Sequence, residues 1–234
     1  MSDQLPYQII ATADFAADVG RHEVVFILNT LPDWQSLADA APAGSAVVLL
    51  DGSSDALQAM AAYLQTVPPA SVDAIHLLSH GSSGSLDLGS TSLSSATLAE
   101  HQDQLIAIGS SLTDAGDILL YGCNVAEGGS GIDFVSRLAQ ITGADIAASN
   151  DITGLIALDG DWDLEVNSAP IEADIIQPDN YNFALATLSS PNDSSSYTWG
   201  DTETFTWTDS HVPPAKPGAC FVNRSKRSFK PCAA

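Results

Sequence analysis

Val-Asp-Ala-Ile-His-Leu-Leu-Ser-His-Gly, residues 72–81, is one of two short apolar runs that decide the fold of this chain. The other is Gly-Asp-Ile-Leu-Leu-Tyr-Gly-Cys-Asn, residues 116–124. Each run is rich in Ile and Leu and is flanked by Gly or Asp, a composition typical of a strand buried on both faces of a parallel sheet. The two runs therefore predict central strands of an α/β domain.

Each predicted strand ends on residues that can take part in chemistry. The first ends at His80 and Gly81, and the second at Gly122 and Cys123. Ligands of open α/β sheets bind beyond the carboxyl ends of the strands, so we expect these residues at the edge that carries the site. A histidine and a cysteine there form a general base and a thiol nucleophile, and a nearby imidazole promotes the reactive thiolate. The backbone N–H groups of Gly81 and Cys123 are expected to stabilise an oxyanion.

The pattern on either side of these runs alternates between strands and helices. Further strands are predicted at 23–28, 45–50 and 144–148, with a weaker one at 7–11. Helices are predicted at 33–41, 55–67, 95–112 and 132–142. Leu86, Leu88 and Leu93 stand among polar residues after His80 and predict a small hairpin. This order indicates a mostly parallel sheet with helices on both faces, that is, a three-layer α/β/α sandwich.

The pattern changes beyond Asn150. Two alternating stretches, 155–158 and 162–166, flank Asp159-Gly160-Asp161 and predict a C-terminal β-hairpin. We expect one α/β domain over residues 1–186. Residues 187–215, rich in Ser, Thr, Asp and Trp, are expected to form a linker or the start of a β module, and residues 216–234 a disordered basic tail.

The charge of the chain excludes several function classes. All 29 acidic residues lie within 1–215, together with only two basic residues, Arg21 and Arg137. Such a body repels nucleic acid, which is bound through Lys and Arg, so no nucleic-acid partner is expected. No apolar run is long enough to span a membrane, which predicts no membrane insertion, and the first residues do not resemble a Sec signal.

Cysteine spacing predicts neither a disulfide framework nor a zinc site. Of the three cysteines, Cys220 and Cys232 lie in the basic tail, without a histidine at metal-ligand spacing. Asp159, Asp161, Asp163 and Glu165 offer oxygens that Ca²⁺ prefers, but alternating acidic residues on a hairpin more often form a solvated face. We therefore predict no metal and no cofactor.

Two motifs and their order resemble a known group of enzymes. Ile-His-Leu-Leu-Ser-His-Gly comes first, and Leu-Leu-Tyr-Gly-Cys-Asn-Val-Ala places Cys123 43 residues after His80. This resembles the caspase and gingipain clan of cysteine peptidases, which have a caspase-like α/β/α fold with a His-Gly after one strand and a Cys after the next. The Gln-Ala-Cys-Arg-Gly context of caspases is absent.

The resemblance is closer still to an uncharacterised bacterial domain. That domain lies at the N-terminus of very large surface adhesins, and Gly-Asp-Trp-Asp-Leu-Glu-Val, residues 160–166, also looks like it. The likeness covers residues 24–186. It implies a caspase-like fold and an extracellular or cell-surface location.

The sequence thus leads to one expected function and two alternatives. We expect a cysteine peptidase that is either self-processing or inactive until triggered, with His80 as base and Cys123 as nucleophile, acting on a peptide or on its own chain. The alternatives are a non-catalytic binding or structural head domain of the same fold and a thiol acyltransferase. Because an Asp-binding pocket needs arginines, we expect any cleavage to follow Arg, Lys or an uncharged residue. His76, in the middle of its strand, is expected to be a core residue.

Overall fold

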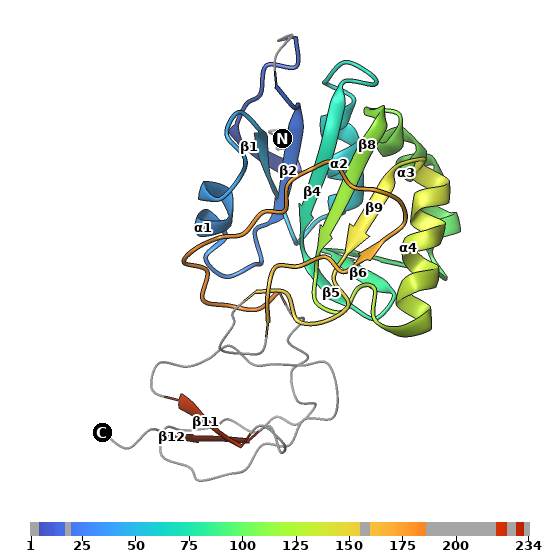
Figure 1. Ribbon diagram of the computed structural model, residues 1–234. Coiled ribbons are helices and arrows are strands. Elements are labelled where there is room, and N and C mark those ends of the chain that lie inside the picture. Colours follow the sequence, from blue (N-terminus) through green and yellow to red (C-terminus); the bar gives the residue numbers. More distant parts are fainter. Residues whose placement is uncertain (1–4, 17–19, 155–159, 186–218, 224–227, 232–234) are drawn as a thin grey trace.

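The computed structural model describes residues 5–16, 20–154, 160–185, 219–223 and 228–231, and Figure 1 shows their arrangement. Its centre is a seven-stranded, mostly parallel sheet with the strand order β1-β3-β2-β4-β8-β9-β10. The mixed α/β class predicted from the sequence is confirmed.

The middle of the sheet consists of five parallel strands. They are β3 (Ala46–Leu50), β2 (Glu23–Leu28), β4 (Val72–Leu78), β8 (Leu112–Tyr121) and β9 (Asp145–Ala148). All of β2 and β3 is buried, as continuous apolar runs require. At the two edges, β1 (Tyr7–Ala11) and β10 (Val166–Asn167) pair antiparallel with β3 and β9. All the predicted strands of this sheet are therefore present.

Three helices lie side by side. They are α2 (Ala56–Leu64), α3 (Gln102–Gly109) and α4 (Gly128–Thr142); α2 packs against α3, and α3 against α4. A short 3-10 helix, η1 (Leu98–His101), precedes α3. Asp55 caps α2 by accepting a hydrogen bond from the backbone of Gln58. Right-handed crossovers in this strand order place these helices on one face of the sheet, and Figure 1 agrees.

The opposite face carries less helix than the sequence predicts. Of the described helices, α1 (Trp34–Asp39) packs against β2 there. The rest of this face is crossed by residues 168–185, an irregular segment shown in orange in Figure 1. The predicted sandwich with helices on both faces is thus met only in part, because irregular chain takes the place of a helical layer.

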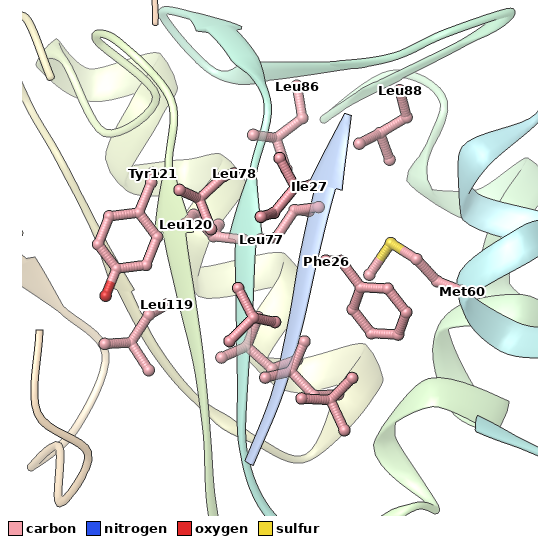
Figure 2. Packing of buried hydrophobic residues seen from close by; sticks show 14 of the residues in the cluster. Phe26, Ile27, Met60, Leu77, Leu78, Leu86, Leu88, Leu119, Leu120 and Tyr121 are labelled. Atoms are coloured by element: carbon pink, nitrogen blue, oxygen red, sulfur yellow. The ribbon is translucent and has the colours of Figure 1, made fainter. Parts of the chain in front are cut away.

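A second, smaller sheet follows β4. It consists of β5 (His80–Ser82), β6 (Ser85–Leu88) and β7 (Thr91–Ser94), all antiparallel. This confirms the predicted hairpin and adds a strand that begins at His80. Figure 2 shows Leu86 and Leu88 in the same apolar cluster as Phe26 and Met60. Burial of these leucines ties the small sheet to the core.

The predicted C-terminal hairpin is wrong where the structure can test it. Its first arm lies outside the described residues, and residues 162–165 form no strand; only Val166–Asn167 pairs, with β9. The alternation has another cause, because Trp162 and Leu164 are buried in the core from irregular chain. Alternating apolar residues thus mark burial here rather than a strand.

Two further observations concern the tail and membranes. Within 216–234, where the sequence predicts disorder, β11 (Ala219–Asn223) pairs antiparallel with β12 (Ser228–Pro231). The predicted domain boundaries and the disorder predicted for 216–234 stay predictions. In the described part of the chain, no helix has the length and apolar character needed to cross a membrane.

Candidate active site

The register of β4 and β8 brings the two predicted site segments together. Leu78 lies directly opposite Tyr121, and the N–H of Ser79 donates to the carbonyl oxygen of Tyr121 at 3.4 Å. His80 and Cys123 therefore each lie two residues beyond the same paired position. They leave adjacent parallel strands at the same, carboxyl-terminal edge of the sheet, as the sequence predicts.

The next residues are in close contact. A Cβ placed on Gly122 would lie 3.2 Å from the Cα and N atoms of Gly81, and a Cβ on Gly81 would lie 3.0 Å from the carbonyl oxygen of Cys123. Side chains at these two positions would push the segments apart. The glycines thus allow the backbone that follows β4 to pack directly on the backbone that follows β8.

The order in which the chain adds strands to the sheet also reverses near the site. The chain runs from β2 to β3 on one side, and then returns across β2 to β4 and continues to β8 and β9 on the other. In open α/β sheets, the crevice for ligands lies at such a switch point, outside the carboxyl ends of the strands. Here the switch point falls between β2 and β4, next to the strand that leads to His80.

Cys123 is buried, and its surroundings favour the protonated thiol. Its side chain is only 1% exposed, and its thiol donates to the carbonyl oxygen of Thr153 at 3.6 Å. Burial raises the pKa of the thiol to about 12, Asp151 adds to this effect, and hydrogen bonds involving the backbone of Thr153 and Leu185 oppose it. Burial thus disfavours a thiolate in this conformation, and the promotion of a thiolate by His80 stays a prediction.

His80 is half-buried and begins β5, directly opposite Asp87 on β6. Two residues further along the same ladder, the hydroxyls of Ser82 and Ser85 are hydrogen-bonded at 2.8 Å. Directly opposed residues of an antiparallel pair place their side chains on the same face, about 5 Å apart at Cβ. Asp87 is therefore a neighbour of His80 that the sequence reasoning missed, because the hairpin was predicted without its register.

A fixed turn follows the cysteine. Asn124 has a left-handed backbone, with φ of 62°, and its N–H donates to the carbonyl oxygen of Asp151. The N–H of Ala126 donates to the carbonyl oxygen of Ser149 at 2.8 Å. These bonds fix the direction in which the chain leaves Cys123. The oxyanion role expected of the N–H groups of Gly81 and Cys123 stays a prediction.

Acidic side chains gather near this turn. Carboxylate oxygens of Asp151, Asp161 and Glu165 lie within 4.8 Å of one another. Burial raises the pKa of Asp151, and Glu165, Asp161 and Asp163 raise it further. Of the four residues weighed for calcium, two thus belong to this group, and Asp159 lies outside the described residues. Of these, Asp151 further disfavours a thiolate at Cys123 by raising the pKa of the thiol.

His76 occupies the core, as predicted from its place within the strand. Its ring is fully buried, with Nδ1 3.1 Å from the hydroxyl of Tyr121 and Nε2 3.3 Å from a carboxylate oxygen of Glu23. Glu23 also pairs with Arg21, which reaches Asp117 at 3.2 Å. This polar network begins at the amino-terminal edge of the sheet, whereas His80 lies beyond the carboxyl-terminal edge. We therefore assign His76 and Arg21 to the structure of the sheet rather than to the candidate site.

Comparison with known protein families identifies a match over much of the chain. Residues 24–183 match the family described as "Domain of unknown function (DUF4347)". No curated protein matches the chain. The matched region runs from the second residue of β2 through β10, and it contains both site segments and most of the irregular segment after β10. Because it covers well over half of the residues, the chain belongs to the DUF4347 family.

Proposed function

We propose that this protein is a cysteine-type hydrolase that cleaves peptide bonds, with His80 as general base and Cys123 as nucleophile. One observation carries the proposal. The paired register of β4 and β8 sends a histidine and a cysteine out of neighbouring strands at equivalent positions, at the edge where such sheets bind ligands. The resemblance to caspases and gingipains supports the same assignment.

The proposed reaction has two steps. His80 accepts the thiol proton of Cys123, and the sulfur attacks the carbonyl carbon of the scissile peptide bond. The carbonyl oxygen becomes an oxyanion that accepts hydrogen bonds from the N–H groups of Gly81 and Cys123. The C–N bond then breaks, the amine takes the proton from His80, and a thioester remains. Water, deprotonated by His80, hydrolyses the thioester and restores the thiol.

Asp87 completes this arrangement as a positioning residue. Nucleophile–base pairs usually have a third group that orients the base. Asp87 is directly opposite His80, and one of its carboxylate oxygens accepts the N–H of Gly89 at 3.2 Å. That bond holds the carboxylate toward the turn after β6, while the register places the Asp87 side chain on the same face as the imidazole. We assign it the role of selecting the ring orientation of His80.

The location of the cations supports a preference for basic or uncharged substrates. Arg21 lies before β2 and is engaged with Glu23 and Asp117, while Arg137 pairs with Asp133 on α4. In the described residues, neither arginine lies at the carboxyl-terminal edge beside Cys123. A pocket for an acidic residue before the cleaved bond would lack its counter-charge there, so we propose cleavage after Arg, Lys or an uncharged residue.

A second candidate is a non-catalytic head domain of a bacterial surface adhesin, the setting that the resemblance implies. The full burial of Cys123 and the rise of its pKa to about 12 favour it, because a thiol of this kind behaves as a small core residue. A thiol acyltransferase, which passes the acyl group to an amine instead of water, is the third.

Trapping the nucleophile separates these candidates. The chain is incubated with peptidyl acyloxymethyl ketones that carry Arg, an uncharged residue or Asp at the reactive end, and intact-mass spectrometry measures the adduct. We expect an adduct on Cys123 with the first two probes and none in Cys123→Ala. Absence of any adduct, under conditions in which iodoacetamide does reach Cys123, would support the head domain. Adding a peptide amine to a thioester substrate then distinguishes acyl transfer from hydrolysis.

A further inference from the structure

The last stretch of the described domain, residues 171–185, covers one face of β8; we call it the strap. It contains no helix and no strand, only an isolated bridge between Ala184 and Gly154. Its buried side chains recur at irregular intervals, and they are Ala173, Ile176, Pro178, Tyr181 and Leu185. The strap is thus attached by apolar burial and a few specific bonds rather than by a continuous ladder.

Two side chains of β8 hold the backbone of the strap. A carboxylate oxygen of Asp117 accepts the N–H groups of Glu172 and Ala173 at 3.1 Å and 2.9 Å. The hydroxyl of Tyr121 accepts the N–H of Ile176 at 2.9 Å. Both acceptors are buried, so displacement of the strap breaks these bonds and exposes the two acceptors to water.

The far end of the strap covers Cys123. The carbonyl oxygen of Thr153 accepts both the N–H of Leu185, at 3.0 Å, and the thiol of Cys123, at 3.6 Å. The side chain of Leu185 is fully buried, and the ring of Tyr181 packs edge-on against Trp162. Strap and thiol therefore share one acceptor, and the thiol is closed off from solvent on this side.

We propose that the strap is an autoinhibitory cover, which opens as a unit to expose Cys123 while the sheet beneath stays folded. That the strap inhibits activity rests on the function proposed above. That it covers Cys123 does not, because access of a reagent to the thiol can be measured without any activity. Opening hydrates Cys123 and removes the burial that keeps it protonated. Local opening of this kind is expected where few bonds and no ladder hold a segment.

The test measures iodoacetamide modification of Cys123 in Tyr121→Phe, which keeps the ring and removes the hydroxyl that binds both Ile176 of the strap and Nδ1 of His76 on β4. Losing one such bond is expected to raise the opening equilibrium, and hence the modification rate, about two- to tenfold. The matched control is Tyr181→Phe on the strap itself, whose hydroxyl has no hydrogen-bond partner among the described residues. It should leave the rate unchanged. Peptide mapping distinguishes modification of Cys123 from modification of Cys220 and Cys232.

Hydrogen exchange separates opening of the strap from unfolding of the domain. In the wild-type chain, hydrogen exchange of the strap amides and modification of Cys123 should give the same opening constant. The strap amides should also exchange much faster than the amides of β4 and β8. Tyr121→Phe should accelerate exchange of the strap more than exchange of β4 and β8, where the lost bond is the one to His76. A second variant, Gly154→Ala, places a Cβ against the carbonyl of Phe183 and should likewise raise the rate. Modification of wild-type Cys123 that occurs only at the rate of β8 exchange would overturn the proposal, because the cover would then not open by itself.

Discussion

Gly81 and Gly122 pack backbone against backbone, and this contact joins the segments that carry His80 and Cys123. A Cβ on Gly122 would lie 3.2 Å from two backbone atoms of Gly81, while a Cβ on Gly81 would lie 3.0 Å from the carbonyl carbon of Gly122. Each glycine is thus required by the position of the other. The candidate site depends on this contact before any chemistry is considered.

Replacing Gly81 by alanine should destabilise the domain and separate the two segments. The new Cβ would lie 2.6 Å from a methyl group of Val125, in a buried position that has no room for it. Overpacking of this kind costs about 1–3 kcal/mol in the free energy of unfolding. Denaturant unfolding measures the loss. Ser82→Ala, at the exposed next residue, should stay within about 0.5 kcal/mol of wild type.

Glu23→Gln should weaken the fold more at neutral than at acid pH. Burial tends to raise the pKa of Glu23, but hydrogen bonds and charge from His76 and Arg21 outweigh it and hold the pKa below its usual value. A lowered folded-state pKa gives stability that is present above the unfolded-state value of about 4.3 and is lost as pH falls through the folded value.

We therefore expect the free energy of unfolding of the variant to fall by about 1–2 kcal/mol at pH 7 and by less near pH 3. The loss at pH 7 stays this small because Arg21 is partly exposed, and solvent screens its attraction to Glu23. Guanidinium unfolding at the two pH values measures this. Glu100→Gln, on the exposed side of η1, serves as control. A loss that is equal at both pH values would show that ionisation of Glu23 adds no stability.

Asp87→Asn should disturb the orientation of His80 while leaving the turn at Gly89 intact. Asparagine keeps the oxygen that accepts the N–H of Gly89, so the substitution removes charge and little else. We expect the ¹⁵N spectrum of the His80 ring to change its tautomer balance, because a carboxylate selects the ring nitrogen that carries the proton. Asp39→Asn, on the exposed end of α1, should leave that spectrum unchanged, and an unaltered His80 signal in Asp87→Asn would remove Asp87 from the site.

Two glycines in helices should respond to alanine in opposite directions. Gly109 ends α3, and a Cβ there would collide with the backbone carbonyl of Thr142 at the end of α4. Gly109→Ala should lower the free energy of unfolding by about 1–3 kcal/mol despite better helix propensity. Gly129, in the first turn of α4, has open space around it, so Gly129→Ala should raise that free energy by about 0.4–1 kcal/mol. Equal effects would contradict the close contact of the two helices.

The parallel sheet could be predicted because its strands are continuous apolar runs. Glu23–Leu28 was predicted with its observed bounds, and the helix predicted from residue 55 agrees with the start of α2, which Asp55 caps. The start of α4 was placed too late, since Gly128–Gly131 has low helix propensity. Contact explains the last of these glycines, because a Cβ on Gly131 would meet the backbone of Ala126.

The candidate site could be predicted only in its position along the strands. His80 and Cys123 follow their strands, and strand ends are visible in a sequence. Asp87 and Asp151 come near them through register and through a turn, and a single sequence specifies neither. The strap has no period at all, so the burial of Cys123 beneath it could not be inferred from composition. The state of the thiol was therefore the part that sequence reasoning predicted least well.

The central claim is that His80 activates Cys123 for attack on a peptide carbonyl, and a ratio of two rates tests it most directly. In the Tyr121→Phe chain, reaction of Cys123 with a peptidyl acyloxymethyl ketone is measured beside reaction with iodoacetamide, which reports access to the thiol. His80→Ala is then added. The account predicts that the ratio of the first rate to the second falls at least about tenfold, because proton transfer by a positioned base contributes about 10²–10⁴ in rate. An unchanged ratio, with Cys123 equally accessible in both chains, would contradict it.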